Sequence, residues 1–179
     1  MRYNVAQLMK EGVGSTRVYT VDEMAALPGE EWESCYVTGR VHLLRTHRGI
    51  LVTGNLQTKV AETCGRCLES YDQDLTLPLE EEFFPTIDVM TGLPVAVPEE
   101  DDPFFIDRSH MLDLLESVRQ SVLVSVPMNP LCRPDCAGLC PVCGANRNLS
   151  PCSCETGSLD PRWGTLGQFL QRLDNAENG

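Results

Sequence analysis

Residues 131–154 have the sequence LCRPDCAGLCPVCGANRNLSPCSC, which holds six cysteines in 24 positions and few side chains that could build an apolar core. These cysteines form three close pairs, and C-G-R-C at residues 64–67 adds a fourth. Close pairs of thiolates on tight turns are typical ligands of tetrahedral metal sites. Structural zinc contributes on the order of 10 kcal/mol of apparent binding free energy. We therefore expect metal, and not hydrophobic burial, to organise this segment.

The spacing of the pairs predicts how they combine into two sites. C-P-V-C-G followed by C-S-C is typical of a self-contained zinc knuckle, and each of the other two pairs lacks two local ligands. Pairing those two with each other would let one ion clamp the turn after a sheet strand to the segment after the longest helix. The predicted ligand sets are Cys140, Cys143, Cys152 and Cys154 for the knuckle, and Cys64, Cys67, Cys132 and Cys136 for the second site. Soft thiolates favour zinc or iron–sulfur, and without another redox signature we expect two zinc ions.

Other interpretations of the cysteines stay open. C-G-R-C alone could be a redox dithiol, although that motif normally opens a helix within a βαβ unit. In a secreted chain, the eight paired cysteines could form disulfides. The first 25 residues contain no apolar run long enough for a signal peptide or a membrane span, so we expect a cytoplasmic protein with reduced cysteines. The ninth cysteine, Cys35, is predicted to be a small buried hydrophobic residue.

The rest of the chain predicts an α+β fold, in which a curved antiparallel sheet carries one main packed helix. The predicted domains are an α+β domain at 1–130 with an acidic loop at 88–103, a zinc-binding segment at 131–155, and a tail at 156–179. β-Branched and alternating apolar residues predict strands. These are expected at 16–21, 35–44, 49–52 and 56–63, and around Leu75, Leu77 and Leu79. Gly54-Asn55 is expected to form a turn, and residues 23–28 are expected to form a turn or a single helical turn.

Helical spacing of apolar residues predicts three helices. A short helix at 4–9 should stop near Gly12. The main helix is expected at 109–124, capped by Asp107 or Ser109 and ended by Pro127. A third apolar stretch at 161–173 predicts a short docking or partner-binding helix.

Charge is distributed unevenly along the 179 residues. The formal net charge is −12, and twelve acids with no lysine or arginine occur from Glu69 to Asp107. Residues 37–67 instead contain five bases and one acid. Binding to nucleic acid through overall charge is therefore not expected. The chain also lacks a Ser-His-Asp arrangement, a phosphate loop and an H-E-x-x-H motif, and a closed four-thiolate zinc site leaves no position for a reacting water, so we expect no enzyme.

Several motifs together resemble one known family. C-G-R-C-L-E, the acidic stretch with prolines, L-D-L-L-E-S-V-R-Q-S-V-L-V-S-V-P, and P-L-C-R-P-D-C-A-G-L-C-P-V-C-G-A-N-R-N…C-S-C are similar to the YceD family of large-subunit ribosomal RNA accumulation proteins. The resemblance covers residues 1–155. That family occurs in bacteria and, as relatives, in plant chloroplasts, and it implies the eight paired cysteines as metal ligands and no catalytic residues.

The resemblance implies a ribosome-biogenesis factor that supports synthesis, processing or stability of 23S ribosomal RNA (rRNA) as a zinc-stabilised adaptor. Expected partners are a pre-ribosomal large subunit, a ribosomal protein or a ribonuclease, with no membrane and no small-molecule substrate. Direct contact with rRNA phosphates is possible through Arg40, Arg45, Arg48 and Lys59. The alternative from another class is a thiol-based redox sensor or zinc-handling protein.

Overall fold

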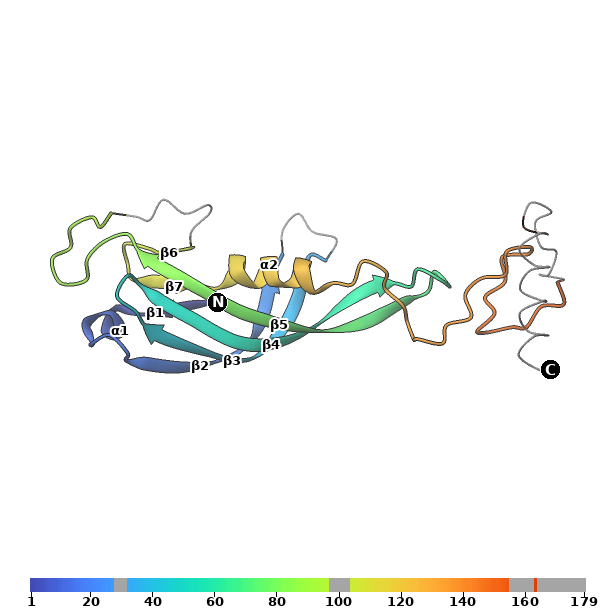
Figure 1. Ribbon diagram of the computed structural model, residues 1–179, viewed down its shortest axis with the longest axis horizontal. Helices are drawn as coiled ribbons and strands as arrows, with labels where there is room; N and C mark the ends of the chain where they lie inside the picture. The colour runs from blue at the N-terminus through green and yellow to red at the C-terminus, as the bar shows by residue number, and fades with distance from the viewer. Residues whose placement is uncertain (28–31, 97–103, 155–162, 164–179) are drawn as a thin grey trace, which may run out of the picture. The chain divides into compact units, whose positions relative to one another are not determined.

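A computed structural model describes residues 1–27, 32–96, 104–154 and Trp163 (Figure 1). The chain divides into two compact units. A sheet unit comprises Met1–Cys64 and Glu69–Cys132, and a cysteine-rich unit comprises Gly65–Leu68 and Arg133–Gly179. The helix predicted at 161–173 lies outside the described residues except for Trp163, which is exposed.

The sheet unit is built on seven strands in the order β1-β7-β6-β5-β4-β3-β2. All neighbouring strands are antiparallel except β5 and β6, which are parallel. The expected α+β fold with a curved sheet is confirmed, although the sheet is mixed. The strands are β1 (Arg2–Asn4), β2 (Thr16–Ala26), β3 (Ser34–Arg45), β4 (Ile50–Thr63), β5 (Ser70–Pro85), β6 (Phe104–Ile106) and β7 (Met111–Asp113); the helices are α1 (Ala6–Lys10) and α2 (Leu115–Ser125).

The sheet curls so that its two terminal strands meet through their side chains. The rings of Tyr3 on β1 and Tyr19 on β2 have centroids 4.7 Å apart. The amino group of Met1 lies 3.6 Å from a carboxylate oxygen of Glu23 on β2. The curl follows from the right-handed twist that accumulates from strand to strand.

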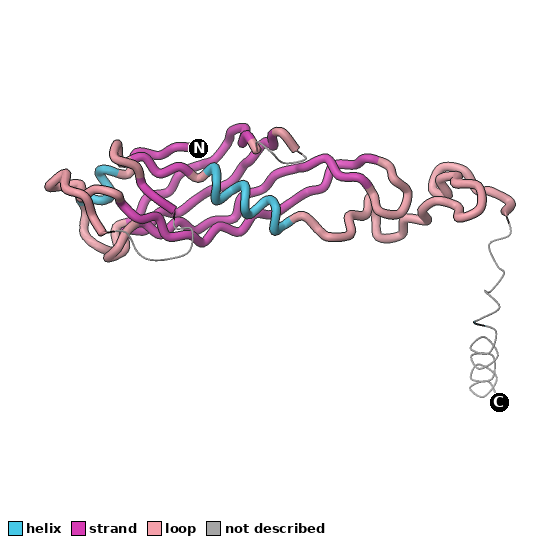
Figure 2. The backbone as a smooth tube through the Cα atoms, turned by 90° about the horizontal axis from the view of Figure 1, so that it is seen from above, coloured by secondary structure: helices cyan, strands magenta, loops and turns pink. Residues whose placement is uncertain are grey.

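One hydrophobic core fills the concave side of this sheet. Every second residue of β3, β4 and β5 faces it, as the strand period of two requires. Helix α2 lies against the strands and buries Val118 and Val122 completely, while Leu8 of α1 is 2% exposed (Figure 2). The prediction that Cys35 is a buried hydrophobic residue is also confirmed, because its side chain belongs to this core.

Strand β4 shows why one predicted turn was wrong. Gly54 and Asn55 lie inside a continuous 14-residue strand, paired with Val41 and Arg40 of β3. A Cβ atom at Gly54 would lie 2.5 Å from the carbonyl oxygen of Arg40. The glycine is needed for close approach of two strands and not for a turn.

Two other boundaries differ from the prediction. Residues 23–26 continue β2 instead of turning, because they pair with β3 as far as Ala26↔Ser34. The main helix begins at Leu115 and not at residue 109, because Met111–Asp113 pairs with β1 as strand β7. At the start of this helix, the Asp113 carboxylate accepts the Leu115 N–H at 3.0 Å. The predicted end before Pro127 is confirmed.

The outer edge of β5 is covered by α2. The hydroxyl groups of Ser121 and Ser125 donate to the carbonyl oxygens of Pro78 (3.0 Å) and Thr76 (3.3 Å). In a strand, the nitrogen and the carbonyl of one residue face the same side. The ring nitrogen of Pro78 therefore also faces this edge, where the missing N–H breaks no ladder bond.

Candidate metal centre

Eight of the nine cysteines gather into two groups of four. Within each group the Sγ atoms all lie within 4.8 Å of one another, which is close enough to bind one metal ion. The structure brings together the same two sets that the spacing predicted: Cys64, Cys67, Cys132 and Cys136 in the first tetrad, and Cys140, Cys143, Cys152 and Cys154 in the second. Each tetrad could hold a metal ion.

Two ligands of the second tetrad, Cys140 and Cys143, lie on one short turn. The Cys140 N–H donates to the carbonyl of Ala145 at 2.8 Å, and the Gly144 N–H donates to the Cys140 carbonyl at 2.9 Å. Gly144 has a φ of +72°, a left-handed conformation that glycine adopts at little cost. The turn therefore brings the thiols of Cys140 and Cys143 to one side.

Electrostatics in this tetrad favour a cation. The backbone N–H groups of Cys143 and Val142 point at the Cys140 sulfur and lower its pKa to about 6. The neighbouring Cys143 sulfur, to which the Cys154 thiol is hydrogen-bonded, raises the pKa of Cys154 to about 12. Several thiolates this close together repel one another, so all four can ionise together only beside a positive charge. A divalent metal ion supplies that charge.

The first tetrad is the more buried of the two. Cys64, Cys67 and Cys136 are all less than 5% exposed. The side-chain N–H of Asn148 donates to the Cys136 sulfur at 3.3 Å, and its oxygen accepts the Ala137 N–H at 2.8 Å. Asn148 was not singled out from the sequence, and a polar residue between two ligand pairs is the only signal that pointed to it. Hydrogen bonds to ligand atoms orient metal ligands and tune their basicity.

Two arginines beside the cysteine pairs organise the cysteine-rich unit. Nη1 of Arg66 donates to the carbonyl of Cys136 at 3.1 Å, and Nη2 of Arg133 donates to the Asn148 side-chain oxygen at 2.6 Å. The backbone of Arg66 contributes too, because its carbonyl accepts the Leu139 N–H at 3.0 Å. The C-G-R-C turn is thus bound to the segment that follows Arg133.

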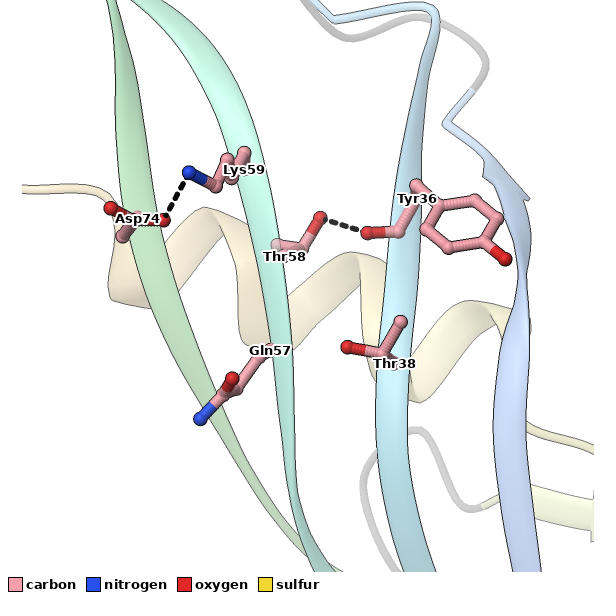
Figure 3. Close-up of a pocket in the computed structure, with 6 residues that line it drawn as sticks. All are labelled: Tyr36, Thr38, Gln57, Thr58, Lys59 and Asp74. Atoms are coloured by element: carbon pink, nitrogen blue, oxygen red, sulfur yellow. Dashed lines mark hydrogen bonds and ion pairs between the residues drawn. The ribbon is translucent and has the colours of Figure 1, made fainter.

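The four basic residues predicted to contact rRNA have unequal surroundings. Lys59 forms an ion pair of 3.1 Å with Asp74 on the outer face of the sheet (Figure 3). Arg48 pairs with Glu82 at 2.5 Å and stacks over the Phe84 ring, and Arg45 donates to the Gly49 carbonyl at 2.8 Å. Arg40 is exposed on β3, and no ion pair is recorded for it among the described residues. Contact of these residues with rRNA stays a prediction.

The described residues contain no helix long and apolar enough to cross a membrane.

Comparison with known proteins supports one family. The model of the YceD family, described as large ribosomal RNA subunit accumulation protein, matches residues 52–170. An uncharacterised protein of Mycobacterium tuberculosis is 32% identical over 127 residues, which are 68% of this chain and 56% of the relative. A chloroplast protein of Arabidopsis thaliana, named as a YCED homolog for large ribosomal RNA subunit accumulation, is 25% identical over 158 residues, 76% of this chain and 49% of the relative. The chain thus spans about half the length of the curated relatives it matches. No solved structure matches.

Proposed function

Because the chain belongs to the YceD family of large ribosomal RNA subunit accumulation proteins, we propose that it supports the synthesis, processing or stability of 23S rRNA as a non-catalytic, zinc-stabilised adaptor. The family gives the link to the large ribosomal subunit. The observation that carries the adaptor proposal is the pair of cysteine tetrads, whose sulfur atoms lie within 4.8 Å of one another. We place its action in the cytoplasm, where ribosomes assemble and cysteines stay reduced.

Zinc is the metal that fits these donors best. Tetrahedral four-thiolate sites are typical of zinc and of iron–sulfur proteins, and zinc needs no redox partner. Backbone N–H groups already point at Cys140, as expected around a ligand sulfur. Such sites stabilise small units with little apolar core, which describes residues 131–154.

A structural role for the metal fits a non-catalytic protein. Four thiolates complete a tetrahedral shell, so no coordination position stays open for a water or a substrate. The metal would hold the cysteine-rich unit in one conformation, and that surface would then be presented to a partner. The partner class we propose is a pre-ribosomal large subunit, reached through a ribosomal protein, a ribonuclease or an rRNA phosphate at Arg40.

The function is tested by deleting the gene and measuring large subunits on sucrose gradients together with 23S rRNA precursors. We expect fewer large subunits and an accumulation of precursors in the deletion strain. The wild-type gene should restore normal levels, and a Cys140→Ser, Cys136→Ser double variant should not. The Cys35→Ala variant is the matched control and should restore growth and rRNA, since Cys35 is a core residue that belongs to neither tetrad. Unchanged large subunits and normal precursors after deletion would contradict the proposal.

A thiol-based redox sensor is the second candidate, and exposure of the second tetrad favours it. Cys143 is exposed, whereas three of the four cysteines of the first tetrad are buried. An accessible thiolate is oxidised more readily than a buried one. A sensor would release zinc from the second tetrad at low peroxide and change its binding to large subunits. Zinc retention at peroxide concentrations that oxidise free thiols would remove this candidate.

A further inference from the structure

The loop that follows β5 is held rigidly by hydrogen bonds. The Asp88 N–H donates to the Leu93 carbonyl and the Gly92 N–H donates to the Asp88 carbonyl, both at 2.8 Å. The Asp88 carboxylate accepts three more hydrogen bonds, from the N–H groups of Met90 (2.9 Å) and Thr91 (2.7 Å) and from the Thr91 hydroxyl (2.9 Å). At the base of the loop, the Val95 N–H donates a hydrogen bond to the Thr86 carbonyl at 3.2 Å. The loop therefore has a defined shape before any partner arrives.

This rigid loop exposes large apolar side chains to solvent. Met90 is 75% exposed and Leu93 64%, and Phe105 on the adjoining strand β6 is 43% exposed. Beside them lies a hollow of about 580 Å³, to which Ile87, Pro94 and Phe105 contribute apolar surface. Single exposed apolar residues are common, but several of them on one loop, next to a hollow that Phe105 lines, are typical of an interaction site. We call this cluster of Met90, Leu93, Val95 and Phe105 the apolar loop patch.

The negative charge of the surrounding sequence indicates that the partner is positively charged. The loop and β6 both belong to the stretch from Glu69 to Asp107, which has no lysine or arginine and has eight acids among its described residues. Such a stretch repels RNA phosphates and attracts a basic polypeptide. Asp107 also lines the hollow, although Arg108 beside it carries the opposite charge.

We propose that the apolar loop patch is a docking surface for a segment of a large-subunit ribosomal protein that is rich in lysine and arginine and inserts an apolar side chain into the hollow. The basic residues of the segment would lie near the described acids of this stretch, such as Asp107 at the hollow, and its apolar residues would cover Met90, Leu93 and Phe105. A preformed loop binds without first losing conformational entropy, which favours tight binding to a short segment. The identity of the partner as a ribosomal protein rests on the proposed function, and its chemistry rests on the patch.

Photo-crosslinking of purified components tests the docking surface. A photoreactive phenylalanine analogue is placed at Met90 of the full chain, and in a control at Val18, which is 55% exposed on β2. The probe is the total protein extracted from large ribosomal subunits of the source organism. We expect the Met90 position, and not Val18, to crosslink to a ribosomal protein at a segment rich in lysine and arginine. Crosslinks to a second copy of this chain, or equal crosslinking from both positions, would overturn the proposal.

Matched substitutions measure the contribution of the patch. A Met90→Ser, Leu93→Ser variant should bind the crosslinked ribosomal protein about tenfold more weakly. The control variant Met24→Ser, Val18→Ser removes similarly exposed side chains from β2 and should bind normally. Equal binding by both variants would exclude the patch. Because this assay uses purified proteins, it is independent of the deletion phenotype, so the docking surface and the proposed function can fail separately.

Discussion

Nη1 of Arg66 donates to the backbone carbonyl of Cys136 at 3.1 Å, across 70 residues of sequence. The same guanidinium reaches the Pro134 carbonyl at 3.4 Å, and the Arg66 carbonyl accepts the Leu139 N–H at 3.0 Å. Arg66 therefore binds with both its side chain and its backbone to the segment that carries the later cysteines. This arrangement holds together two predicted ligands, Cys67 and Cys136, that are far apart in the sequence.

Removing the Arg66 side chain should weaken metal retention without removing a ligand. Arg66→Ala loses hydrogen bonds from a charged donor, worth about 1 kcal/mol at an exposed site, which corresponds to roughly fivefold faster loss of metal to a chelator. The measurement is zinc transfer to a coloured chelator over time. Arg147→Ala is the control, because this residue is exposed and its side chain forms no hydrogen bond or ion pair with the part of the chain that the structure describes. Equal rates for the two variants would contradict the role of Arg66.

Single cysteine substitutions should remove one metal ion at a time. Cys64→Ser takes a ligand from the first tetrad and Cys143→Ser takes one from the second, so each variant should carry one zinc ion where the wild type carries two. Native mass spectrometry counts the ions. The control variant Cys35→Ala, which changes a core cysteine outside both tetrads, should keep both ions. If Cys64→Ser also kept both, the first ligand set would be wrong.

Adding a methyl group at Gly54 should destabilise the sheet. The new Cβ would lie 2.5 Å from the Arg40 carbonyl oxygen and 3.2 Å from Val41, both backbone neighbours on β3 that cannot move aside easily. We expect Gly54→Ala to cost about 2 kcal/mol of unfolding free energy, measured by urea denaturation. Gly12→Ala meets nothing within 4 Å and has no left-handed φ, so it should be close to neutral. A neutral result at Gly54 would mean that the strands can separate there.

The carboxylate of Asp113 should account for part of the loss of folding stability at low pH. Burial raises its pKa, but the hydrogen bonds from Arg2 and the Leu115 N–H outweigh burial and hold the pKa below the ordinary value of 3.8. A carboxylate whose folded pKa is lowered adds stability above its unfolded pKa, and this stability is lost as the pH falls through the folded pKa. The stabilisation should therefore be complete above about pH 5, begin to fall near the ordinary pKa of 3.8, and disappear only as the pH passes below the lowered folded pKa.

Urea denaturation between pH 5 and pH 3 checks this expectation. The wild type should lose stability steeply toward pH 3, and Asp113→Asn should be less stable at pH 5 with a shallower dependence. Asp74→Asn is the control, since its ion pair with Lys59 is exposed and contributes little. Parallel pH profiles for the wild type and Asp113→Asn would show that Asp113 is not responsible.

The cysteine groups could be predicted from the sequence because ligand geometry is local and demanding. Cys140 and Cys143 need only one tight turn to face the same metal ion. The pairs Cys64/Cys67 and Cys132/Cys136 each lack two ligands nearby in the sequence, so each could complete a site only with the other. Asn148 could not be predicted in the same way. Its role depends on where the turn places its amide relative to the Cys136 sulfur, and spacing does not encode that position.

The sheet was predictable in its alternation but not in its boundaries. Leu75, Leu77 and Leu79 alternate as a strand requires, and all three are buried as expected. The predictions at Gly54 and Met111 were wrong because strand pairing overrode the local preference for a turn at Gly54 and for a helix at Met111. Glycine at a close contact resembles glycine in a turn, and Met111 has helical spacing although it pairs with Asn4.

The proline at the outer margin of β5 has a consequence for how these molecules behave at high concentration. A foreign strand that approached there would meet a ring nitrogen with no hydrogen to offer and two carbonyl oxygens already engaged by serine hydroxyls. Strand-by-strand growth of one molecule onto the next is therefore blocked along this part of the margin, which protects the chain against fibril formation at that place.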